Sequence, residues 1–147
     1  MKYLSKNSLS RRLNAELPFD RDGYFYDGAC AELRSVSLSS RVGLGRLIRV
    51  TARYARQVDS ESLIGFTDQL AGWRGVPRVR KHSPVEISVG ELESFIRRHV
   101  HFRDPKDYAD NYYFADEGLN WFAVFCHEGD WHLFSRQRSS LSKLSLR

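Results

Sequence analysis

Residues 112–135 read YYFADEGLNWFAVFCHEGDWHLFS, which is three aromatic-rich segments separated by two similar turns. The turns are residues 116–118 (DEG) and 127–129 (HEG). Each places glycine third, where a three-residue hairpin loop needs a left-handed residue. We therefore predict that this stretch forms a three-stranded antiparallel meander.

The two turns also predict which strand residues lie opposite each other. Tyr113 is expected opposite Trp121, and Val124 opposite His132, because a one-residue slip would move every side chain to the other face. This register gives one apolar face, which should pack under helices, and one mixed face of aromatic and polar residues. The mixed face is the predicted partner-binding surface, and its residues are Tyr112, Phe114, Phe122, Asp130, His132 and Phe134.

The rest of the chain supplies helices and short strands. Apolar residues at helical spacing predict helices over residues 4–17, 44–58, 60–71 and 88–100. The last of these begins with a capping box formed by Ser88 and Glu91. Strands are expected at residues 24–26, 29–39 and 85–87, and residues 76–82 are expected to form an edge strand or an extended basic loop.

This order of elements favours an α+β fold, in which three or four helices pack on one face of a small antiparallel sheet with the C-terminal three-stranded meander. Residues 1–135 are expected to form a single domain. Residues 136–147 are rich in serine, leucine and basic residues, so we expect a mobile basic tail.

The charge of the chain is unevenly distributed. The 147 residues carry a net charge of +5, and arginine, whose planar fork of donors suits phosphate and carboxylate, supplies most of the basic residues. Residues 34–56 contain six arginines and no acid, whereas residues 104–130 contain seven acids against one lysine. The uneven distribution indicates that one surface attracts anions and another repels them.

Four arginines follow one side of the helix predicted over residues 44–58. Arg46, Arg49, Arg53 and Arg56 lie opposite the apolar residues of this helix and extend over ~15 Å, which suits successive phosphates. Together with Arg78 and Arg80 they are the predicted nucleic-acid-binding residues. Two other interpretations are a solvated helix face and a ridge that pairs with the acidic segment of the same chain.

The densest cluster of reactive side chains spans residues 126–132. Cys126, Asp130 and His132 share a face in the predicted register, which makes them candidate ligands for a metal or parts of a thiol-dependent site. Zinc ligands usually come from two places in a chain, and the other short-spaced histidine pair, the H-x-H at residues 99–101, is only a weak signal at the end of a predicted helix. We therefore prefer a structural role for Cys126 and His132, and we predict no cofactor and no catalytic residue.

Other familiar signals are incomplete. Gly43 and Gly45 precede a helix, but Ile48 stands where a dinucleotide-binding motif has its third glycine. Two cysteines, Cys30 and Cys126, are too few for a disulfide scaffold, and we expect free thiols in a cytoplasmic protein. Without an apolar run of roughly 18 residues, no membrane partner is expected.

These observations predict a non-enzymatic protein-binding module, such as a small bacterial regulatory or toxin-neutralising (immunity-type) protein. Its expected partner is another protein, which would dock on the mixed aromatic face. Two alternatives are a nucleic-acid-binding protein that uses the arginine-striped helix and a small metal- or thiol-dependent hydrolase.

Overall fold

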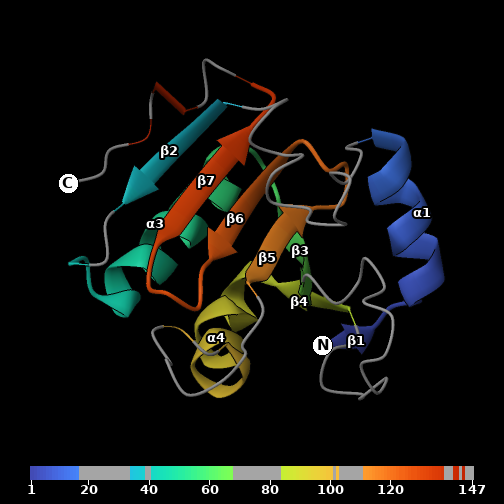
Figure 1. The fold of residues 1–147 in the computed structure, drawn as a ribbon, viewed down its shortest axis with the longest axis horizontal. Coiled ribbons are helices and arrows are strands. Elements are labelled where there is room, and N and C mark those ends of the chain that lie inside the picture. The colour runs from blue at the N-terminus through green and yellow to red at the C-terminus, as the bar shows by residue number, and fades with distance from the viewer. Residues whose placement is uncertain are drawn as a thin grey trace.

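The described part of the protein is built on an antiparallel sheet of seven strands in the order β1-β4-β3-β5-β6-β7-β2 (Figure 1). The computed structural model describes residues 1–16, 34–38, 41–67, 84–100, 102, 111–137, 141–142 and 144. The strands are β1 (Lys2–Tyr3), β2 (Arg34–Leu38), β3 (Ser62–Thr67), β4 (Val85–Ser88), β5 (Tyr112–Asp116), β6 (Trp121–Phe125) and β7 (Trp131–Ser135). The helices are α1 (Lys6–Glu16), α3 (Leu44–Gln57) and α4 (Leu92–His99), and the 3₁₀ turn η3 (Val89–Glu91) directly precedes α4. The α+β fold and the C-terminal meander β5-β6-β7 are confirmed.

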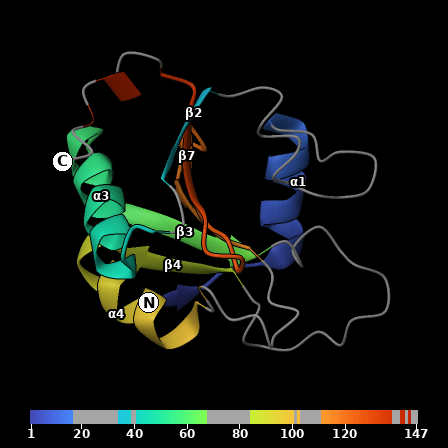
Figure 2. The same cartoon turned by 60° about the vertical axis from the view of Figure 1, so that its left-hand side comes forward.

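Helices cover both faces of the sheet (Figure 2). On one face, Leu9 and Leu13 of α1 pack in a cluster with Phe122. On the other face, α3 and α4 lie over a larger cluster that contains Trp121 and Trp131. The prediction that the helices share one face is therefore wrong. The central strands carry apolar side chains on both sides, so each side needs a covering layer.

Three predicted helices are present with the expected buried stripes. Leu9 and Leu13 of α1 are buried, and α3 begins at Leu44 as expected, with Gly43 as its N-cap. The Ser88–Glu91 capping box is confirmed. The backbone N–H of Ser88 donates to Glu91 Oε2 at 2.9 Å, and this hydrogen bond lowers the pKa of the Glu91 carboxyl.

Residues 60–71, predicted as a helix, contain strand β3 instead, and the prediction is wrong. β3 pairs with β4 on one side and with β5 on the other. All residues from Leu63 to Thr67 are buried, because helices cover both faces of this central strand. A strand buried on both faces gives a continuous apolar run, which periodicity does not separate from a buried helix.

The two hairpins of the meander differ in register. Between β6 and β7, Val124 lies opposite His132, as predicted. Between β5 and β6, Tyr113 lies opposite Val124 instead of Trp121, so this part of the prediction is wrong. The shift is an odd number of residues. It therefore moves the side chains of β5 to the opposite face relative to those of β6.

The cause of the shift is a longer first turn. Asp116 Oδ1 accepts hydrogen bonds from the backbone N–H groups of Asn120 (2.6 Å) and Trp121 (3.2 Å). The residue with positive φ is Leu119 (54°) rather than Gly118, and the Leu119 side chain is fully buried. The carboxylate and the buried leucine together close a loop that is longer than three residues. In the second turn Gly129 has φ of 100°, as predicted.

Several predicted segments lie outside the described residues: the strand at 24–26, the segment 76–82 with Arg78 and Arg80, and Cys30. Of the strand predicted at 29–39, β2 is described and pairs with β7. In the segment predicted as a tail, Leu141 and Leu144 are buried against the cluster under α3 and α4.

Candidate functional site

The mixed aromatic face predicted for partner binding does not exist as an open surface. The shifted register divides its aromatic residues between the two faces of the sheet. Tyr112 and Phe114 lie in the cluster under α3 and α4, whereas Phe122 and Phe134 lie in the cluster under α1. All four are buried, and Asp130 and His132 keep partial exposure.

The second turn does bring together Cys126, Asp130 and His132. Their arrangement supports the turn and does not form a reactive site. The backbone N–H of Cys126 donates to the Asp130 carbonyl at 2.9 Å, which closes the hairpin. Burial raises the pKa of the Cys126 thiol and lowers the pKa of the His132 imidazole, although the nearby Asp130 opposes the second shift. A thiol that stays protonated is a poor nucleophile. Within the described ranges, no group of three His, Cys, Asp or Glu side chains could hold a metal ion.

Helix α3 presents its predicted arginine row to solvent. Arg46, Arg49, Arg53 and Arg56 are all exposed. The opposite side of the helix is buried and consists of Leu47, Ile48, Val50, Thr51, Ala52, Tyr54 and Ala55. The predicted division of this helix into an apolar side and a basic side is therefore confirmed.

Two buried hydrogen bonds fix the rotation of α3 on the sheet. Trp131 Nε1 donates to Thr51 Oγ1 at 3.1 Å, and the Tyr54 hydroxyl donates to Ser135 Oγ at 2.9 Å. Both bonds join the helix to β7, and the residues in them are fully or nearly fully buried. Because buried polar groups must keep their partners, these bonds hold the arginine row on the outer side.

Helix α4 adds cations beside α3, a contribution that was not predicted from the sequence. The two helices pack side by side on the same face of the sheet (Figure 2). Arg97 and Arg98 lie exposed in the last turn of α4, and Arg97 Nη2 pairs with Glu93 Oε1 at 2.8 Å. The spacing of Glu93 and Arg97 by four residues was the available signal for this pair. The spacing of residues within α4 does not, however, indicate which other helix Arg97 approaches.

We call the exposed side of α3 together with Arg97 and Arg98 the arginine face. Within its described span, α3 contains no acidic residue. Among the described residues, the large apolar side chains exposed to solvent are Met1 and Tyr3, and neither belongs to α3 or α4. The α3 part of the arginine face is therefore strongly cationic, and the arginine face lacks large exposed apolar side chains.

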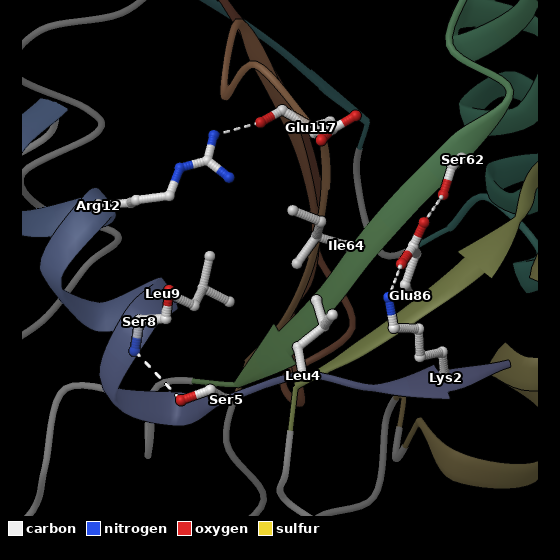
Figure 3. Close-up of a pocket in the computed structure, with 10 residues that line it drawn as sticks. All are labelled: Lys2, Leu4, Ser5, Ser8, Leu9, Arg12, Ser62, Ile64, Glu86 and Glu117. Carbon is white, nitrogen blue, oxygen red and sulfur yellow. Dashed lines mark hydrogen bonds and ion pairs between the residues drawn. The ribbon is translucent and has the colours of Figure 1, made fainter.

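A cavity lies between α1 and the sheet (Figure 3). Its volume is about 260 Å³, and its apolar wall includes Leu4, Leu9 and Ile64. Its polar groups contact one another: Ser62 Oγ donates to Glu86 Oε1 at 3.1 Å, and the Arg12 guanidinium donates to the Glu117 carbonyl. The volume is slightly below the ~300 Å³ at which ligand pockets usually begin. We assign this cavity no function.

Comparison with protein-family models, with curated proteins and with solved structures gives no match for this chain. In the part of the chain that the structure describes, no helix combines the length and apolar character needed to cross a membrane.

Proposed function

We propose that this chain is a non-enzymatic nucleic-acid-binding protein that docks on the sugar–phosphate backbone through the arginine face. The observation that carries the proposal is the row of four exposed arginines on α3, a helix whose described residues include no acid. Guanidinium groups donate bidentate hydrogen bonds to phosphate oxygens, and phosphate contacts dominate the affinity of proteins for nucleic acid.

The dimensions of the row suit a duplex backbone. The row extends over ~15 Å, since each helical residue advances ~1.5 Å. Phosphates on one strand of a duplex advance ~3.4 Å along its axis, so the row passes several of them. Single-stranded ligands usually need aromatic side chains on which bases stack. The described part of the arginine face exposes no large aromatic side chain, which favours a duplex over a single strand.

The composition of the arginine face favours nucleic acid over a protein partner. Protein interfaces combine arginine with aromatic and apolar anchors that become buried on binding. The aromatic residues predicted for such an interface are already buried in the two cores. The protein-binding hypothesis thus loses the aromatic surface that motivated it. Binding of an acidic protein to the arginine face is the alternative that the test below distinguishes from binding of nucleic acid.

The test measures binding to a fluorescently labelled DNA or RNA duplex by anisotropy at about 50 mM salt, where phosphate contacts are strong. We expect Arg49→Ala/Arg53→Ala to weaken binding about tenfold, which corresponds to about 1.4 kcal/mol. The matched single variants are Arg53→Ala, which should weaken binding, and Arg11→Ala, which should not. Arg11 is also exposed but lies on α1, across the sheet from α3.

Two results would contradict the proposal. One is equal binding by wild type and Arg49→Ala/Arg53→Ala. The other is displacement of the duplex by polyglutamate at matched charge concentration, which would indicate a surface for acidic proteins instead of nucleic acid.

A further inference from the structure

Two guanidinium groups from different helices converge on one point of the arginine face, above Gly45. The position that a Cβ atom of residue 45 would occupy lies 3.5 Å from Arg49 Nη1 and 3.5 Å from Arg97 Nη2. Because both distances end at the same point, the two nitrogens are at most twice that distance apart. Arg49 belongs to α3 and Arg97 to α4, so the packing of the two helices creates this juxtaposition.

The position of Arg97 is fixed by its own helix. Arg97 Nε and Nη2 both donate to Glu93 Oε1, at 3.0 and 2.8 Å. Two donors of one guanidinium group thus share a single carboxylate oxygen, which restricts the rotamers of a side chain that would otherwise move freely in solvent. Glu93 therefore keeps one cation close to another, although like charges repel each other.

We propose that Arg49 and Arg97 form a clamp for a single phosphate group, with Glu93 as a positioning residue. This inference rests on the proposed function and names one specific phosphate contact within that site. Guanidinium nitrogens bind phosphate oxygens at ~2.7–2.9 Å, and a phosphate in a nucleic-acid backbone has two free oxygens. Two guanidinium groups at this separation can each take one of these oxygens.

The absence of a side chain at residue 45 leaves the space between the two guanidinium groups open. A methyl group there would be in ordinary van der Waals contact with both nitrogens, so Gly45→Ala fits the folded protein. The same methyl group would occupy the space that the phosphate oxygens need. Gly43 offers a matched control, because its added Cβ would meet nothing within 4 Å.

The experiment compares Gly45→Ala with Gly43→Ala, using the duplex and the anisotropy assay described above, with thermal melting as the check on folding. We expect Gly45→Ala to weaken binding about tenfold while its melting temperature stays unchanged or rises, since alanine favours helix over glycine. Gly43→Ala should bind as wild type does.

Glu93→Ala, which removes both the negative charge and the hydrogen-bond acceptor of Arg97, gives a test in which the direction of the change in affinity decides. Removal of an acid from a phosphate-binding surface should strengthen binding through net charge alone. The clamp predicts the opposite, because Arg97 loses the contact that positions it. A double-mutant cycle adds a third readout. Arg49→Ala and Arg97→Ala should be non-additive because they share one phosphate, whereas Arg56→Ala and Arg97→Ala should be additive.

The results separate the two proposals. If wild type does not bind the duplex at low salt, the proposed function and the clamp are both overturned. If wild type binds, but Gly45→Ala binds equally well and Glu93→Ala binds more tightly, the proposed function stands and the clamp is overturned. Weaker binding by both variants, with Gly43→Ala unchanged, supports the clamp.

Discussion

The hydrogen bond from Trp131 to Thr51 should be essential for holding α3 on the sheet. Both side chains are fully buried, and Trp131 Nε1 donates to Thr51 Oγ1 at 3.1 Å. Thr51→Val keeps the shape of the side chain and has a similar helix propensity, but it removes the acceptor. An unsatisfied buried donor costs about 1–3 kcal/mol, so we expect the free energy of unfolding to fall by that amount.

The assay is urea denaturation followed by far-UV circular dichroism, in wild type and in the Trp131→Phe background. Phenylalanine has no N–H group, so Thr51→Val should cost much less in that background. The difference between the two costs is the coupling energy of the pair, and we expect about 1–2 kcal/mol. An equal cost for Thr51→Val in both backgrounds would refute the assignment of this hydrogen bond as an anchor of α3.

Three further predictions concern the meander. Phe122→Ala should lower the free energy of unfolding by about 3–5 kcal/mol in urea denaturation, because Phe122 is fully buried, and a near-zero cost would indicate a surface residue. Burial lowers the pKa of His132, so the unfolded chain takes up its proton first as the pH falls below about 6.5. Stability should therefore decrease through that range, and His132→Gln should remove this part of the pH dependence of urea denaturation. The Cys126 thiol is half-buried and its pKa is raised. A thiol reagent at mildly alkaline pH should therefore modify Cys126 much more slowly in the native protein than in the unfolded protein, and equal rates at this residue would contradict the prediction.

The parts of the fold that local patterns specify were predictable from the sequence. The alternation of arginine and apolar residues along α3 follows from the 3.6-residue period, and burial on the sheet reinforces it. The second hairpin turn was predictable because Gly129 takes the left-handed conformation that its position requires.

The first hairpin turn has the same local pattern but a different structure. Its left-handed residue is Leu119, whose side chain is buried in the cluster under α1. Burial of this side chain and the hydrogen bonds to Asp116 outweigh the preference of glycine for that conformation. Such tertiary contacts cannot be deduced from the turn sequence alone, and the error in register placed four buried aromatic residues on a surface.

The convergence of Arg49 and Arg97 is also a product of tertiary structure. The two residues are far apart in the sequence, and the packing of α4 beside α3 brings them together over Gly45. The sequence indicated the glycine, as part of an incomplete phosphate-binding motif, and the arginine row. It did not indicate that another helix supplies a second guanidinium group at that point.

The most direct test of the proposed function is the salt dependence of duplex binding by the wild-type protein. Each phosphate that a protein neutralises on a duplex contributes a slope of about −0.9 to the logarithm of the binding constant against the logarithm of salt concentration. If the four arginines of α3 contact phosphates, the slope should be about −3 to −4. A slope near zero, or no binding at low salt, would contradict the assignment of the arginine face to nucleic acid.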